Sequence, residues 1–138
     1  MTHLLDTNAV ISVLEAVPGE SFAGVPATVS TQLSIVTIVE LTFGVESARR
    51  SGSGDLALRE NQRLFATSQW RPIPVDMAVA LAFGQVSQSA LGAGQHPRKR
   101  MNDLMIAATA LVHGLVLVTD DEALARAVEG VVAVTPFR

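Results

Sequence analysis

Acidic residues in apolar surroundings, at predicted boundaries between strands and helices, are the groups of this 138-residue chain best suited to chemistry. They are Asp6, Glu40, Asp103 and Asp121, with Asp120 as a competitor for the last position. Two carboxylates ~5 Å apart repel by about 3 kcal/mol at an effective dielectric constant near 20. If these acids converge, they need a cation, and oxygen ligands without thiolates favour Mg²⁺ or Mn²⁺.

Each of these acids also has a purely structural interpretation. The segments 37–40 and 119–122 have the spacing of capping boxes. Asn102 would cap a helix whose dipole favours Asp103 in its first turn, and Asp6 would cap the first helix. Capping explains an acid at the start of a helix, but it does not explain why the turns that follow are so apolar.

The elements that must position the acids alternate along the chain. Short apolar runs predict strands at 3–6, 33–36, 71–75, 115–120 and 131–136. Helical spacing predicts helices at 7–15, 37–50, 55–70, 76–91, 102–113 and 121–129, with loops at 17–25, 51–54 and 92–97. Such alternation favours right-handed crossovers and a parallel sheet covered on both faces. We therefore expect an α/β three-layer sandwich with a central parallel sheet of four to five strands, formed by one domain over residues 1–138.

This topology places several of the acids at one edge. In an open parallel sheet, ligands bind outside the carboxyl ends of the strands. Asp6 and Asp121 follow predicted strands, and Glu40 lies in the first turn of the helix predicted after the second strand. These three therefore face one crevice, whereas topology alone does not place Asp103.

Composition excludes several classes of protein. With 49% hydrophobic and 17% charged residues the chain is not intrinsically disordered, and without cysteine it has no disulfide scaffold and no cysteine nucleophile. The most apolar stretch, 104–118, is shorter than the roughly 20 residues of a membrane span, and no secretory signal is evident. We expect a cytoplasmic protein without membrane contact. A net charge of −3 excludes binding of nucleic acid over the whole surface but leaves room for a local basic patch.

Four segments together resemble the PIN domain. They are Leu4-Leu5-Asp6-Thr7-Asn8, Val39-Glu40-Leu41, the run Asn102-Asp103-Leu104-Met105-Ile106-Ala107-Ala108-Thr109-Ala110, and Val118-Thr119-Asp120-Asp121. The first and third segments are the specific ones, and the resemblance covers nearly the whole chain. Together with the length, these segments look most like the VapC toxins of type II (VapBC) toxin–antitoxin pairs.

The resemblance implies a Mg²⁺-dependent endoribonuclease, with Mn²⁺ as a substitute, in which metal-activated water cleaves RNA phosphodiesters. By this resemblance Asp6, Glu40, Asp103 and Asp121 are the catalytic and metal-binding acids, and Thr7, Asn8 and Thr119 orient them. It also implies a homodimer and a VapB-like antitoxin that lays a C-terminal segment across the toxin. The apolar helices 7–15 and 37–50 would supply the groove for that segment.

Arg98-Lys99-Arg100 is the one concentrated run of positive charge, and it suits RNA phosphates. A solvated loop is the alternative interpretation of this run. His96 lies beside it, whereas His113 is expected to end its helix, where a cation is favoured. The chain has no tyrosine and a single tryptophan, which argues against a base-stacking platform.

Three rival functions come from other classes. A phosphoacceptor receiver domain needs a lysine near a late strand end, but the only lysine, Lys99, lies in a predicted loop. A PIN-like binding module without catalysis and a metal-dependent nuclease directed at DNA both remain open.

Overall fold

The computed structural model describes residues 2–16, 20, 22, 25 and 30–138. Within them, four strands form one parallel sheet in the order β2-β1-β3-β4. The strands are β1 (His3–Leu5), β2 (Thr31–Leu33), β3 (Val116–Val118) and β4 (Val134–Thr135). The helices are α1 (Thr7–Glu15), α2 (Ile35–Ser51), α3 (Leu56–Gln69), α4 (Met77–Gly92), the short 3₁₀ helix η1 (Pro97–Arg100), α5 (Met101–His113) and α6 (Glu122–Ala127). The predicted α/β class and parallel sheet are confirmed.

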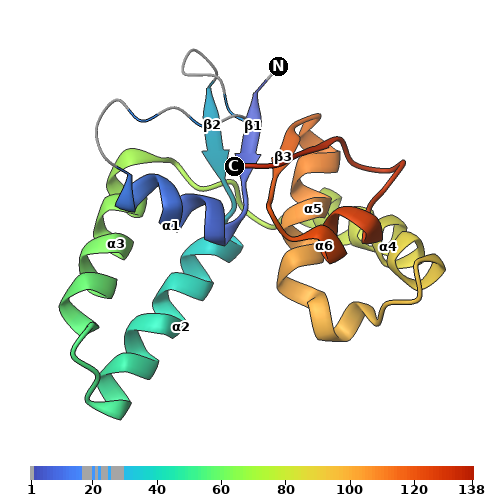
Figure 1. Cartoon of the computed structure of the whole chain (residues 1–138). Helices are drawn as coiled ribbons and strands as arrows, with labels where there is room; N and C mark the ends of the chain where they lie inside the picture. The colour runs from blue at the N-terminus through green and yellow to red at the C-terminus, as the bar shows by residue number, and fades with distance from the viewer. Residues whose placement is uncertain (1, 17–19, 21, 23–24, 26–29) are drawn as a thin grey trace.

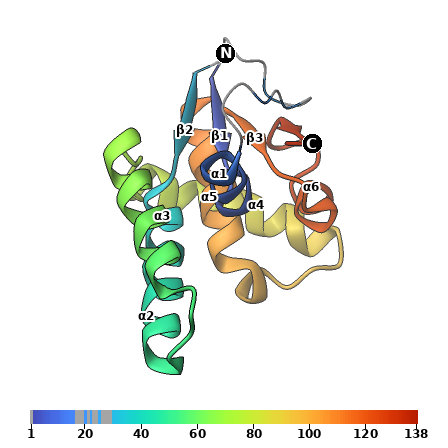
Figure 2. The same ribbon diagram turned by 60° about the vertical axis from the view of Figure 1, so that its left-hand side comes forward.

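Helices cover both faces of the sheet, because successive strand residues point to opposite sides. Leu4 and Leu117 belong to a core cluster with α4, α5 and α6, whereas Leu5 and Val118 belong to another with α1, α2 and α3. Figure 1 shows α2 and α3 on one side of the molecule and α4, α5 and α6 on the other. In Figure 2, α1 lies in front of β1 and α5 lies behind it. These are the three layers that the alternation of elements predicts.

The carboxyl ends of three strands meet at one edge of the sheet. The register pairs Leu5 with both Leu33 and Val118, so Asp6 and Thr119 come next along β1 and β3 at the same level. The Asp6 N–H donates to the Val118 carbonyl over 3.1 Å and links the carboxyl ends of β1 and β3. Because β2 and β4 lie on opposite sides of the β1–β3 pair, this pair marks the topological switch point of the sheet.

The predicted strand 71–75 is wrong. Only a single parallel bridge forms there, between Ser34 and Ile73, with hydrogen bonds from Ile73 N–H to Leu33 and from Ile35 N–H to Ile73. Pro72 and Pro74 flank Ile73 and have no N–H to donate, so the ladder cannot extend beyond this one residue.

The second strand and its helix are also displaced from the prediction. The strand ends at Leu33, Ser34 caps α2 by accepting from Val36 N–H over 3.0 Å, and the helix begins at Ile35. The predicted capping box at 37–40 is therefore wrong: Thr37 is a buried residue inside the helix, and Glu40 lies in its second turn. An apolar run that passes from strand to helix gives no sign of where one becomes the other.

Helix α5 begins one residue earlier than predicted and directly follows η1, so Asn102 is not its cap. Pro97 opens η1, where a fixed φ and a missing N–H suit the start of a helix. The strands predicted at 115–120 and 131–136 shorten to β3 and β4. The predicted loop 17–25 lies outside the described residues except for 20, 22 and 25. In the part of the chain that is described, no helix has the length and apolar character needed to cross a membrane.

Candidate functional site

Asp6 occupies the centre of the carboxyl edge, directly after β1. It is 6% exposed, it caps α1, and its Oδ1 accepts from Ala9 N–H over 2.8 Å. Burial raises the pKa of Asp6 above its usual value. Hydrogen bonds from the Thr119 hydroxyl and Ala9 N–H oppose this shift, and the charges of Asp120 and Asp121 add to it. Capping and membership of the acidic group are thus compatible roles for one side chain.

Glu40 reaches this edge from α2, and hydroxyl groups hold it in place. The Thr7 hydroxyl donates to Glu40 Oε1 over 2.5 Å and lies 3.2 Å from the Thr37 hydroxyl. Thr37 thus belongs to the site, a role that our sequence interpretation missed by treating it as a cap. The signal that could have revealed this role is the position of Thr37 three residues before Glu40, which places both on the same face of a helix.

Asp103, in the first turn of α5, interacts with all three other acids. Burial raises its pKa, and the negative charges of Glu40, Asp121 and Asp6 raise it further, while Arg100 opposes the shift. A carboxylate is disfavoured by like charges only where they lie close. Asp103 also lines a cavity with Glu40 and shares the Arg100 guanidinium with Asp121, so the acid whose placement topology left open lies near acids of the sheet edge.

Arg100 lies between two of the carboxylates. Its Nη1 is 3.4 Å from Asp103 Oδ2 and 3.3 Å from Asp121 Oδ2, and its side chain is only 24% exposed. Our sequence interpretation grouped Arg100 with Arg98 and Lys99 as an RNA contact. In the structure it differs from both, because its guanidinium contacts acids of the site.

Asp121 and Asp120 point to different partners. Asp121 caps α6, where its Oδ1 accepts from Ala123 and Leu124 N–H over 3.0 and 3.1 Å. Partial burial raises the pKa of Asp121, but these bonds and Arg100 outweigh it and lower the pKa. The oxygen of Asp120 instead accepts from the N–H groups of Phe137 (2.7 Å) and Arg138 (3.1 Å). Of the two aspartates, only Asp121 shares the Arg100 guanidinium with Asp103.

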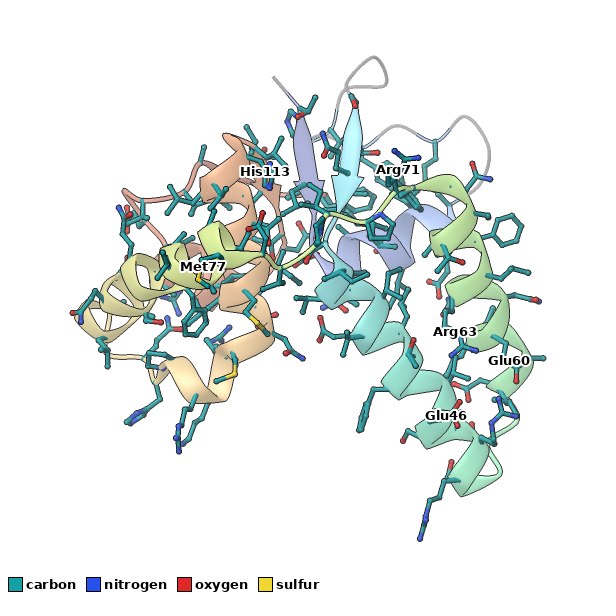
Figure 3. All side chains as sticks on the ribbon, turned by 180° about the vertical axis from the view of Figure 1, so that it is seen from behind. Glu46, Glu60, Arg63, Arg71, Met77 and His113 are labelled. Carbon is teal, nitrogen blue, oxygen red and sulfur yellow. The ribbon has the colours of Figure 1, made fainter. Side chains whose placement is uncertain are left out.

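Two cavities each contain two of the four acids. One of about 270 Å³ is lined by Asp6, Asp120, Asp121 and the exposed Asn8, together with Ala9, Ser12 and Phe137. The other, of about 310 Å³, is lined by Glu40, Asp103 and the run 98–102. The basic run is thus part of the cavity wall, beside two of the acids. His113 ends α5 before β3 and so lies toward the amino edge of the sheet, away from both cavities (Figure 3).

The donor chemistry of the site fits a hard divalent cation. Carboxylate oxygens and hydroxyls surround it, and the mutual repulsion felt by Asp103 calls for positive charge. Among the described residues, no three acidic or histidine side chains lie close enough to hold one ion together. Mg²⁺ commonly binds through one or two carboxylates and keeps several waters. Arg100 stands between two of the carboxylates that would hold it.

Comparisons with known proteins identify the family and the fold of the chain. The sequence profile of the PIN domain matches residues 3–130. A solved structure of VapBC-5, a member of the VapBC family of toxin–antitoxin systems from Mycobacterium tuberculosis, is 25% identical with a TM-score of 0.72 and covers 99% of this chain and 98% of its own. FitAcB from Neisseria gonorrhoeae is 26% identical with a TM-score of 0.68 and covers 96% of each chain.

VapBC2 from Rickettsia felis, solved bound to a DNA fragment from its promoter, has the same fold at 17% identity, with a TM-score of 0.72 over the whole of both chains. A comparison with curated protein sequences found no match. The match over residues 3–130 covers most of the chain, and the four-stranded parallel sheet flanked by helices agrees with it. The chain belongs to the PIN domain family.

Proposed function

We propose that the protein is the ribonuclease toxin of a VapBC-type pair, an endoribonuclease that uses Mg²⁺ or Mn²⁺ to hydrolyse RNA phosphodiesters. The proposed metal-binding and catalytic residues are Asp6, Glu40, Asp103 and Asp121. The observation that carries the proposal is the placement of Asp103, whose carboxylate lines one cavity with Glu40 and shares the Arg100 guanidinium with Asp121. Family membership and the similarity to VapBC structures support the same function.

Three of the four acids have a hydrogen-bond donor that fixes one oxygen. Thr7 donates to Glu40, Thr119 supports Asp6, and the start of α6 holds Oδ1 of Asp121, while its Oδ2 contacts Arg100. Such support orients ligand oxygens before a cation arrives. A divalent ion at such a site lowers the pKa of water and offsets charge on the leaving oxygen. The proposed role of the acids is to hold this ion rather than to carry protons.

Arg98 and Lys99 are the proposed RNA contacts. Both are exposed and line the cavity that also contains Glu40 and Asp103. Among the described residues neither forms an ion pair, so both cations are available for phosphate. Positive charge beside an acidic site provides the attraction for a polyanion that the net charge of −3 lacks.

The proposed partners are a VapB-like antitoxin and a second copy of the chain. The VapBC-5 structure, which resembles this chain, comes from a member of the VapBC family of toxin–antitoxin systems. On α2, Ile35, Val39 and Phe43 recur every four residues and are 37, 57 and 74% exposed. We propose this apolar stripe on α2 as a contact surface for a segment of the antitoxin. The proposed cleavage of cellular RNA implies a cytoplasmic protein, and we propose this location.

The function is tested by incubating the full chain with tRNA, ribosomal RNA and single- and double-stranded DNA. We expect cleavage of RNA that EDTA abolishes and that Mg²⁺ or Mn²⁺ restores. The products are resolved on denaturing gels. Cleavage of DNA but not RNA would establish the DNA-directed alternative. RNA binding without cleavage under all metal conditions would instead identify a binding module.

Neutralising the exposed cations should weaken RNA binding and reduce its dependence on salt. In Arg98→Gln/Lys99→Gln, loss of two phosphate contacts should reduce the slope of log K against log[salt] by roughly 1.4 for single-stranded RNA. Fluorescence anisotropy between 50 and 200 mM NaCl measures this slope in the catalytically inactive Asp103→Asn background. Arg71→Gln is the control, since Arg71 is exposed and lies beside the start of β2, at the opposite edge of the sheet (Figure 3). An unchanged slope would show that Arg98 and Lys99 do not contact RNA phosphates and belong to a solvated loop.

A further inference from the structure

Arg100 is the only member of the basic run that the structure turns toward the acids. Its guanidinium bridges Asp103, three residues later on α5, and Asp121, at the start of α6. The first contact is local, but the second joins segments 21 residues apart. Arg98 and Lys99 are exposed and, within the described part of the chain, pair with no acid. The geometry thus separates one cation of the run from the other two.

The position of Arg100 has a consequence for cation binding. Its Nη1 lies 3.3–3.4 Å from one oxygen of each carboxylate, which is where a cation shared by Asp103 and Asp121 would lie. A guanidinium and a divalent ion cannot share that position, because their charges repel. The Arg100 side chain is about three-quarters buried, whereas the two acids are 37 and 38% exposed, so ions can reach the carboxylates from solvent.

We propose that Arg100 is a built-in counter-ion of the acidic site, which holds Asp103 and Asp121 together and which a divalent cation must displace in order to bind. This inference rests on the proposed function, in which the acids bind metal. Arg100 lines the cavity that also contains Arg98 and Lys99, so the released guanidinium lies within a phosphate-binding wall. A planar guanidinium suits phosphate, with which it forms paired hydrogen bonds. Arg100 is thus a positioning residue: it contacts the two carboxylates before the cation binds, and it contacts a substrate phosphate afterwards.

The first test is calorimetric titration of Mn²⁺ and Mg²⁺ into the full chain after removal of metal with EDTA. Arg100→Gln should bind the ion about tenfold more tightly than the wild type, a typical size for coupled binding events. Arg98→Gln removes the same charge from the same segment without breaking a bridge, and it should change the affinity by less than about twofold. Its effect measures the general influence of one positive charge near the site.

The second test separates displacement from a merely structural role. Without metal, Arg100→Gln should lower the melting temperature by about 2–4 °C, since the two carboxylates lose their shared partner. With saturating Mg²⁺ this difference should vanish, because the ion has replaced Arg100 in both proteins. If Arg100 only stabilises the fold, the difference is the same with and without metal, and the inference is overturned.

The two proposals fail in different ways. If no variant binds either ion, both the metal site and the role of Arg100 are wrong. If the wild type binds metal and Arg100→Gln binds it no more tightly than Arg98→Gln does, only the counter-ion role is wrong. Binding by Arg100→Gln where the wild type shows none would support both.

Discussion

Asp103→Asn should abolish RNA cleavage, with a rate at least about 10²-fold below that of the wild type, the loss expected when one group that stabilises the transition state is removed. The substitution keeps the volume of the side chain but replaces an anionic oxygen with an amide nitrogen. The charges of Glu40, Asp121 and Asp6 all act on Asp103, and its carboxylate lines a cavity with Glu40 and contacts Arg100, so we expect it to bind the cation. Single-turnover cleavage at saturating Mg²⁺ measures the effect.

The fold of this variant can be checked by its stability. Burial and neighbouring acids raise the pKa of Asp103, so the folded state disfavours its ionised form. The resulting penalty is absent below the usual pKa near 3.8, grows as the pH rises from there to the raised pKa, and is constant above the raised pKa. Without metal, Asp103→Asn should therefore melt about 1–3 °C above the wild type at pH 7 and should lose this advantage in acid.

A matched control comes from the start of another helix. Asp76 caps α4 by accepting from Val79 N–H over 3.0 Å, and it is exposed and outside both acidic cavities. Asn is also a good cap, so Asp76→Asn should retain cleavage and stability. Full activity in Asp103→Asn would reject the proposed site, and a marked loss of its melting temperature would show that the lost cleavage reflects unfolding.

The fold class could be predicted from the sequence because the fold class depends on a coarse feature, the alternation of short apolar runs with longer helical ones. The boundaries of strands and helices depend instead on single residues that compete for the same role. Ser34 and Thr37 are both good caps in one apolar run, and only the pairing of Leu33 with Leu5 shows that the strand has already ended before Ser34. Likewise, Ile73 looks like part of a strand until the missing N–H groups of Pro72 and Pro74 are considered.

The candidate site divides in the same way. Asp6 and Asp121 could be placed from sequence, because the ends of parallel strands share an edge. The approach of Asp103 depends instead on how α5 packs under the sheet, and the Thr7–Thr37–Glu40 contacts depend on how α1 meets α2. The turn of Arg100 away from Arg98 and Lys99 arises at the junction of η1 and α5. Spacing along the chain does not encode these tertiary contacts.

Asp120 and Asp121 should separate clearly when each is changed to Asn. Asp121→Asn should reduce cleavage by at least about 10²-fold, because its Oδ2 faces Asp103 across Arg100. Asn still caps α6, so the helix is retained, but loss of the charge that pairs with Arg100 should lower the melting temperature slightly. The same single-turnover assay and thermal melting report the two properties.

Asp120→Asn should do the reverse. Asp120 accepts from the backbone N–H groups of Phe137 and Arg138, and thereby holds the buried Phe137 ring in the core cluster around Leu5 and Val118. A neutral acceptor in place of a charged one should cost about 1 kcal/mol of stability, yet it should change cleavage less than about threefold. Loss of cleavage in Asp120→Asn with retained activity in Asp121→Asn would identify Asp120 as the fourth acid. In that case Asp120 would bind the metal, and the role of Asp121 would be limited to capping α6 and pairing with Arg100.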